Sequence, residues 1–187
     1  MAGSRHARGT FSAHFPRRRH RGDRGEGRTA PAFGDHLSVT LSKDAGTPFP
    51  IGASLGDGGI NVAVLSRHGE RVLFCVFDDA GDRELHRFAL PQRLGDVHFG
   101  FIAGLGPGTR YGLRVEGPWN EKDGHRFDPA KLLVDPYARR IDRAFRYDAA
   151  LCARGVETAP LVLKAIVEQH LEEATRLPLH RPNLIYE

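Results

Sequence analysis

Five short apolar segments, spaced along residues 58 to 117, limit the folds that this sequence can adopt. In each segment apolar residues stand at alternate or successive positions, and stretches rich in Gly, Asp and Pro separate one segment from the next. Short strands at such regular spacing are typical of an antiparallel β-sandwich, so the sequence predicts an all-β fold. The segments are GGINVAVLS (58–66), RVLFCVFDD (71–79), ELHRFAL (84–90), VHFGFIAG (97–104) and RYGLRVEG (110–117).

The alternation also assigns side chains to faces, because successive residues of a strand point to opposite sides of a sheet. Tyr111, Leu113 and Val115 are expected to point into the core and Arg114 outward. The segment 71–79 is apolar on both faces, as a central strand of a sandwich would be. Two further stretches have the composition of hairpin turns, SRHGER (66–71) and DDAGDR (78–83).

The β pattern ends after Gly117. Asp128 and Pro129 suit the start of a helix, which predicts one helical turn over PAKLLV (129–134). We also expect a helix over LVLKAIVEQHLEEATR (161–176). The chain ends in LIYE (184–187), which has the composition of an opening strand without a partner and indicates a truncated protein. The C-terminal part is therefore predicted to be a linker containing short helical segments.

The basic charge of the chain lies in its first 36 residues, which hold eight arginines against three acidic residues. This segment has no hydrophobic period and is predicted to be disordered. Its stretch RRRHRGDRGEGR (17–28) could contact the phosphates of RNA or DNA. The favoured interpretation is a solvated leader, or an upstream stretch absent from the natural product, because the remaining residues are nearly neutral and add no support for nucleic-acid binding.

No apolar run is long enough to span a membrane, and no apolar stretch follows the N-terminal arginines as it would in a secretory signal. The two cysteines, Cys75 and Cys152, are far apart in the sequence, and Cys75 lies in an apolar run where a small buried thiol is expected. These features predict a reduced, cytoplasmic setting.

No complete catalytic or metal-binding motif is present, so no catalytic residue, metal or cofactor is predicted. The sequence lacks a G-x-S-x-G motif and a phosphate loop, and its ten histidines do not have the spacing of zinc ligands. The histidines of HGER (68–71) and GDVHFG (95–100) are interpreted as surface imidazoles. Asp78 and Asp79 are expected in a turn, rather than as two carboxylates that face each other across a glycosidase cleft.

Trp119 is the single tryptophan, in the loop-like stretch EGPWNEKDG (116–124). Its ring could stack on the apolar face of a sugar, or it could close the end of the sandwich or an interface between domains. The candidate carbohydrate-binding residues are Trp119, His125 and Arg126.

The stretch GHRFDPAKLLVDPYARRI (124–141) follows directly. Its charges alternate in sign over a short span, which favours an internal network of ion pairs and hydrogen bonds that holds a rigid connector.

These motifs together resemble a known family. GGINVAVLSRHGERVLFCVFD, GPGTRYGLRVEGPW, GHRFDPAKLLVDPYARRI and the final LIYE look like the N-terminal part of bacterial glycogen debranching enzymes, and isoamylases are similar. The resemblance runs from about Thr47 to Ile141 and returns at the last residues. It implies an immunoglobulin-like sandwich of the family-48 carbohydrate-binding-module type, which in that family precedes a (β/α)₈ barrel that hydrolyses α-1,6 branch points.

The resemblance divides the chain into an Arg-rich leader (1–36), a sandwich (45–141), a linker (142–183) and the start of a missing barrel (184–187). A barrel needs roughly 200 residues or more, so none of the family's catalytic residues can be placed on this sequence. The stretch 124–141 is then expected to lie against the barrel. The predicted interface residues are Phe127, Asp128, Lys131, Leu132, Leu133, Asp135 and Tyr137.

Three functions are compatible with these observations. The leading hypothesis is an accessory, glucan-binding domain of a glycogen debranching enzyme, inactive in hydrolysis by itself. Its expected partners are glycogen or another α-glucan and the catalytic barrel. The second is a stand-alone α-glucan-binding module without catalysis. The third and least favoured is nucleic-acid binding through the Arg-rich leader.

Overall fold

The computed structural model describes residues 38–169. Three expectations therefore lie outside the described residues: the disorder of the leader 1–36, the helix beyond residue 169, and the barrel strand at 184–187. The domain boundaries drawn within these segments stay predictions.

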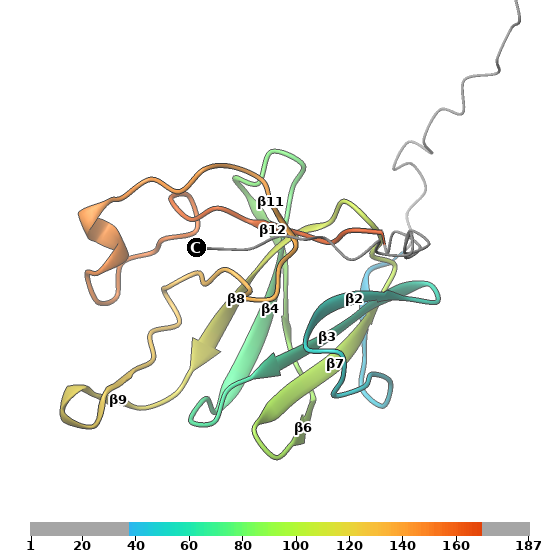
Figure 1. The fold of residues 1–187 in the computed structure, drawn as a ribbon, viewed down its shortest axis with the longest axis horizontal. Coiled ribbons are helices and arrows are strands. Elements are labelled where there is room, and N and C mark those ends of the chain that lie inside the picture. Colours follow the sequence, from blue (N-terminus) through green and yellow to red (C-terminus); the bar gives the residue numbers. More distant parts are fainter. Residues whose placement is uncertain (1–37, 170–187) are drawn as a thin grey trace, which may run out of the picture. The chain divides into compact units, whose positions relative to one another are not determined.

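Two antiparallel sheets form the described part of the chain (Figure 1). The first sheet has the order β1 (Thr40–Ser42), β7 (Val97–Ala103), β3 (Gly59–Leu65), β2 (Gly52–Gly56), with β6 (Gln92–Leu94) also paired to β7. The second sheet has the order β11 (Arg140–Ile141), β12 (Ala165–Ile166), β8 (Arg110–Glu116), β4 (Arg71–Phe77), β5 (Glu84–Ala89). A small hairpin of β9 (Trp119–Asn120) and β10 (His125–Arg126) encloses the 3₁₀ turn η1 (Glu121–Asp123), and a second 3₁₀ turn, η2, spans Ala149–Leu151.

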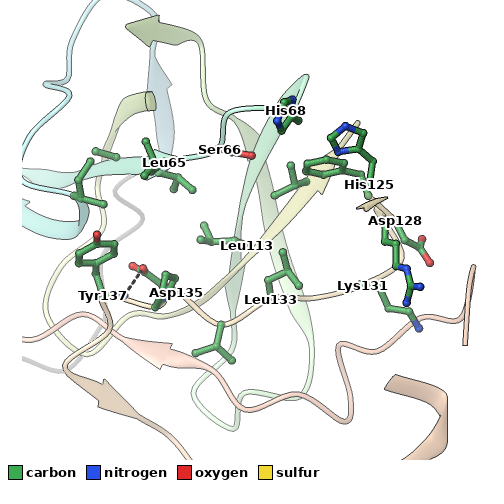
Figure 2. A pocket seen from close by; sticks show the side chains of 18 of the residues that line it. Leu65, Ser66, His68, Leu113, His125, Asp128, Lys131, Leu133, Asp135 and Tyr137 are labelled. Atoms are coloured by element: carbon green, nitrogen blue, oxygen red, sulfur yellow. Dashed lines mark hydrogen bonds between the residues drawn. The ribbon is translucent and has the colours of Figure 1, made fainter. Parts of the chain in front are cut away.

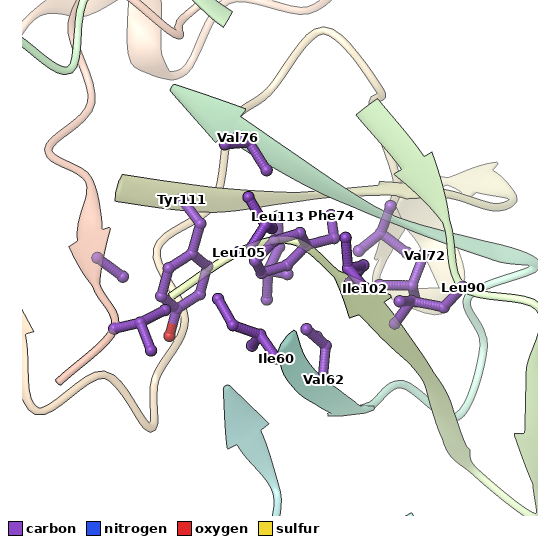
Figure 3. Packing of buried hydrophobic residues seen from close by; sticks show 13 residues of the cluster. Ile60, Val62, Val72, Phe74, Val76, Leu90, Ile102, Leu105, Tyr111 and Leu113 are labelled. Carbon is purple, nitrogen blue, oxygen red and sulfur yellow. The ribbon is translucent and has the colours of Figure 1, made fainter. Parts of the chain in front are cut away.

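The predicted all-β, immunoglobulin-like antiparallel sandwich is confirmed, and all five segments singled out in the sequence are strands. Buried side chains from both sheets meet between them, as Figure 3 shows for Ile60 and Ile102 against Phe74 and Tyr111. The rings of Phe74 and Tyr111 stack with centroids 5.0 Å apart. β4 is central, because it pairs with β5 on one side and β8 on the other.

One of the two predicted hairpin turns is a hairpin and the other is not. DDAGDR joins β4 to β5, where the Asp78 carboxylate accepts hydrogen bonds from the backbone of Asp82 and Arg83. SRHGER instead leads from β3 in the first sheet to β4 in the second. Turn composition marks a reversal of the chain, but the packing of the two sheets decides which strand the chain pairs with next.

Arg114 does not point to solvent as the alternation predicted, since its side chain is only 1% exposed. Parts of the segments 128–132 and 149–163 cover this outer face of the second sheet. The Arg114 guanidinium donates hydrogen bonds to Glu84 at 3.0 Å and Glu157 at 2.7 Å, and to the carbonyl of Pro129 at 2.9 Å. Apolar residues of β4 pack beside it against the same cover, including Leu73 and Cys75.

The predicted linker contains one short helical segment among the described residues, the 3₁₀ turn η2, whereas PAKLLV and the described part of LVLKAIVEQHLEEATR are not helical. PAKLLV forms one turn closed by a hydrogen bond from Lys131 N to Asp128 O, and Leu133 then bridges Leu113 in an antiparallel manner. Residues 149–169 contain the single 3₁₀ turn η2 and the strand β12, which pairs with β8. β12 contributes the buried Ala165 to the core. This segment forms a strand and not a helix because the edge of β8 offers backbone hydrogen bonds that outweigh its local preference for helix.

No helix within residues 38–169 is long and apolar enough to cross a membrane.

Candidate functional site

A groove of about 780 Å³ lies beside the β9–β10 hairpin. Four parts of the sequence form it: Ile51 just before β2, the end of β3 with the loop that follows, the second half of β8, and residues 124–137. Figure 2 shows His68 and His125 at one end, Tyr137 and Asp135 at the other, and Leu113 and Leu133 between them. A concave, mainly apolar surface with a few polar groups is the usual form of a ligand site.

A cluster of three rings forms one end of the groove. The ring centroids of His68 and His125 are 4.5 Å apart, and those of His125 and Phe127 are 6.3 Å apart. Phe127 packs partly into the core beside Gly117, where an added Cβ would lie 2.8 Å from the Phe127 ring. The absence of a side chain at Gly117 therefore lets Phe127 approach the sandwich and support the two imidazoles.

Asp135 fixes the other end of the groove. Its carboxylate is buried and accepts hydrogen bonds from the Tyr111 hydroxyl at 2.8 Å and from the backbone N–H of Tyr137 at 2.9 Å. Burial, together with the neighbouring Asp135 charge, raises the pKa of Tyr111 far above its ordinary value, so this hydroxyl stays protonated and donates. The ring of Tyr137 is 57% exposed at the rim. Gly52 permits this position, since a Cβ there would lie 2.9 Å from the Tyr137 Cβ.

Asp128 and Lys131 attach the groove wall to the loop that carries η2. Asp128 accepts hydrogen bonds from the backbone of Ala130 at 3.0 Å and Gly155 at 2.7 Å. Burial alone would raise the pKa of Asp128, but these two hydrogen bonds hold it below its usual value. Lys131 donates to the carbonyls of Ala150 and Val156. The expected network therefore exists at these two residues, although it consists of hydrogen bonds to backbone and not of ion pairs.

Leu132 and Leu133 point in opposite directions, as successive residues of an extended segment do. Leu132 is 3% exposed and packs against Leu73 and Cys75 on the outer face of the second sheet. Leu133 is 45% exposed and lines the groove. Among the predicted interface residues, Leu133 and Tyr137 are the exposed ones; Leu132 and Asp135 are buried within the domain itself.

The three candidate carbohydrate contacts share one hairpin but do not form one surface. Trp119 pairs with Arg126 across the hairpin, and Asn120 pairs with His125. Trp119 and His125 therefore project from opposite faces. His125 and Arg126 line the groove, whereas Trp119 does not. The guanidinium of Arg154 lies 4.2 Å from the centroid of the Trp119 ring and covers one of its faces.

His68 is the groove residue that sequence reasoning missed. His68 is exposed, as predicted for a surface imidazole, but its ring also contacts His125 from a distant part of the chain, which was not predicted. No local sequence pattern predicts this contact, because it depends on how the chain crosses from β3 in one sheet to β4 in the other. Among residues 38–169, no group of three or more His, Cys, Asp or Glu side chains is arranged to hold a metal ion.

The groove coincides with a recognised module. The sequence profile of carbohydrate-binding module 48, the isoamylase N-terminal domain, matches residues 50–138. The matched segment includes every residue that lines the groove, from Ile51 to Tyr137.

The resemblance of the chain to the N-terminal part of glycogen debranching enzymes is confirmed. The glycogen debranching enzyme of Klebsiella pneumoniae subsp. pneumoniae is 54% identical over 98 residues, which are 52% of this chain and 15% of that protein. That of Salmonella paratyphi B is 53% identical over 97 residues, which are 52% of this chain and 14% of that protein. The chain thus spans about 15% of the length of these curated relatives.

Solved structures show a weaker likeness. The catalytic module of the multi-modular glycogen-degrading pneumococcal virulence factor SpuA has a TM-score of 0.48 and 19% identity, over 64% of this chain and 16% of that chain. The Group B Streptococcus pullulanase SAP in complex with maltotetraose has a TM-score of 0.45 and 16% identity, over 64% of this chain and 14% of that chain. The resemblance to the family therefore rests on the sequence matches.

Proposed function

We propose that this domain binds α-glucan chains in the groove, as the N-terminal accessory module of an enzyme that acts on the α-1,6 branch points of glycogen. One observation carries the proposal: the whole lining of the groove falls inside the segment that matches a carbohydrate-binding module. The high identity to proteins named glycogen debranching enzymes supports glycogen as the glucan.

The ring cluster supplies the surface that a glucan chain needs. A glucose ring has apolar faces and polar edges, so it is recognised by flat rings together with hydrogen-bonding groups around them. His68, His125 and Phe127 provide the rings at one end of the groove. Arg126 provides a donor beside them. We assign His125 and Arg126, which line the groove, as direct sugar contacts, and Trp119, which does not line it, as a contact that only a chain longer than the groove reaches.

Affinity electrophoresis in gels that contain glycogen tests this proposal. The intact protein should be retarded, His125→Ala should lose most of the retardation, and Trp119→Ala should lose less. His86→Ala is the matched control, because His86 is exposed on β5 and outside the groove. Normal migration of a folded wild-type protein would overturn glucan binding, and so would equal effects of His125→Ala and His86→Ala.

A second candidate function for the groove is to dock the next domain of a longer enzyme. The exposed apolar side chains of Leu133 and Tyr137 favour it, since single-domain proteins rarely leave such residues side by side without a partner. The other predicted interface residues, which are buried or half-buried, would then support this surface from within the domain: Phe127, Asp128, Lys131, Leu132 and Asp135. Docking would be favoured over glucan binding by two results together: the folded wild-type protein does not bind glycogen, and Leu133→Ser reduces its self-association.

We also propose a cytoplasmic setting for the protein. Both cysteines are free thiols, Cys75 buried and Cys152 exposed, which suits a reducing compartment. Burial raises the pKa of the Cys75 thiol to about 12 and makes it unreactive.

A further inference from the structure

A second cavity, of about 750 Å³, lies at the opposite end of β8 from the groove. Arg110 at the start of β8 lines this second cavity, whereas Val115 near the end of β8 lines the groove. At about 3.3 Å per strand residue, these two positions are roughly 16 Å apart. The other walls come from the β4–β5 turn, residues 142–148 and residues 160–161. Most of these residues lie outside the segment that matches the family-48 module.

The base of the second cavity is held in a fixed position. The Asp142 carboxylate accepts hydrogen bonds from the backbone N–H of Lys164 at 2.8 Å and from the Arg143 guanidinium at 3.0 Å. Arg143 also donates to Asp82 at 3.1 Å and to the carbonyl of Ala80 at 2.6 Å. These contacts tie the loop after β11 to the β4–β5 turn, so the cavity keeps its shape before any ligand arrives.

Several side chains that line the second cavity are not engaged in this way. The nearest ionic partner of Arg110 is Asp79 at 3.9 Å, whose side chain is fully exposed, and the Arg110 Nε is buried without a hydrogen-bond partner among residues 38–169. Arg146 makes no hydrogen bond or ion pair with any residue in that range. The ring of Tyr147 is 75% exposed. The Tyr147 ring therefore lines the same cavity as the guanidinium groups of Arg110 and Arg146, which have N–H donors without a hydrogen-bond partner in residues 38–169.

The charges around the second cavity favour a neutral ligand over an anion. Arg143 is neutralised by Asp142 and Asp82, and Asp148 also lines the cavity. Arginine donors, aspartate acceptors and one exposed ring suit the hydroxyl groups and apolar face of a sugar. The carboxylates of Asp142 and Asp148 offset two of the three arginine charges in the lining, so little net positive charge is left to hold a phosphate.

We propose that this second cavity is a second carbohydrate site, which takes a neutral oligosaccharide of an α-glucan, with Tyr147 stacked on a sugar ring and Arg110 and Arg146 bonded to its hydroxyls. The inference rests on the proposed glucan-binding function of the module. Two sites on one domain bind one branched polymer together, because the first contact raises the local concentration of chains at the second. The module then prefers a branched glycogen particle to a short linear chain.

The experiment compares the intact 187-residue protein with Tyr147→Ala and Arg146→Ala, measuring affinity for glycogen and for maltotriose. Phe145→Ala is the matched control, since Phe145 is a neighbouring aromatic that is 68% exposed and does not line the cavity. We expect Tyr147→Ala to weaken glycogen binding by about tenfold or more, because the second contact of a bivalent interaction is lost. Phe145→Ala should leave it unchanged. In a His125→Ala background, the remaining maltotriose binding should depend on Tyr147.

The outcomes separate this proposal from the function on which it rests. A wild-type protein that binds glycogen, together with Tyr147→Ala and Arg146→Ala variants that bind it equally well, overturns the second site and leaves the groove intact. A folded wild-type protein that binds no glucan overturns both. If glucose 1-phosphate competes at the Tyr147-dependent site far better than maltose does, the site is an anion site and the neutral-sugar assignment is wrong.

Discussion

The Tyr111 hydroxyl donates a hydrogen bond to the Asp135 carboxylate at 2.8 Å, and this contact joins the core of the sandwich to the rim of the groove. Tyr111 stacks on Phe74 between the sheets. The Asp135 carboxylate also accepts a hydrogen bond from the backbone N–H of Tyr137. The stability of the sandwich and the shape of the groove are therefore coupled through one buried carboxylate.

Tyr111→Phe tests this coupling. The substitution removes one donor and leaves Asp135 buried with fewer partners, so the free energy of unfolding should fall by about 1.5–3 kcal/mol. Urea denaturation measures the change. Tyr137→Phe is the control, because the exposed Tyr137 hydroxyl makes no hydrogen bond within residues 38–169. Equal stabilities of the two variants would show that Asp135 finds another donor, such as water, and that the coupling is absent.

Arg114→Ala should be among the most destabilising substitutions on the second sheet. Removing the guanidinium leaves Glu84 and Glu157 without their shared partner, and breaking a buried ion pair costs about 3–5 kcal/mol. Because Glu157 is about half exposed, we expect the lower end of this range. Thermal or urea unfolding gives the measurement.

The Arg71–Glu116 pair, an exposed ion pair that links β4 and β8 of the same sheet, is the matched control for Arg114→Ala. The Arg71 side chain is 60% exposed, so Arg71→Ala should cost about 1 kcal/mol or less. If Arg114→Ala were as mild as Arg71→Ala, the cover over this face of the sheet would be loosely held.

Gly117→Ala should disturb the ring cluster of the groove. An added Cβ would lie 2.8 Å from the Phe127 ring and 3.1 Å from the carbonyl of His68, which is closer than packed atoms allow. Phe127 must move, so we expect a loss of about 1–3 kcal/mol in stability and weaker glycogen binding. Gly106→Ala is the control, because no atom lies within 4 Å of its added Cβ. If Gly117→Ala bound glycogen as well as the wild type does, the ring cluster would not be part of the sugar site.

Sequence periodicity located the long strands because each of them is encoded locally. In GINVAVL the alternation of Ile60 and Val62 is complete within seven residues. The burial of Arg114 has no such signal, since it depends on Glu157, which the chain brings back over the sheet more than forty residues later. The same applies to the contact between His68 and His125 and to the pairing of β12 with β8. Motif resemblance pointed to residues 124–137 as functional, but only the folded chain distinguishes the exposed Leu133 from the buried Leu132.

His98 should make the stability of the module depend on pH. This histidine is 4% exposed, so the prediction of a surface imidazole in GDVHFG is wrong. Its Nε2 is buried without a hydrogen-bond partner among residues 38–169. Burial, and next the positive charge of Arg93, lower the pKa of His98 below its ordinary value. As the pH falls, the unfolded chain takes up this proton before the folded chain does. Stability is therefore fully present above an unfolded pKa of about 6.5 and is lost as the pH falls through the folded pKa.

His98→Gln removes this proton uptake and should flatten the stability profile between about pH 7 and pH 5, as urea denaturation at a series of pH values would show. The carboxylates affect the stability of the protein only at lower pH. Burial opposes the ionisation of Glu157, but the hydrogen bond from Arg114 brings the net pKa of Glu157 below its usual value, so its contribution is lost only below about pH 4.5. His86→Gln, at an exposed position on β5, is the control and should keep the wild-type slope. A His98→Gln profile parallel to that of the wild type would mean that His98 becomes protonated as readily in the folded chain as in the unfolded one.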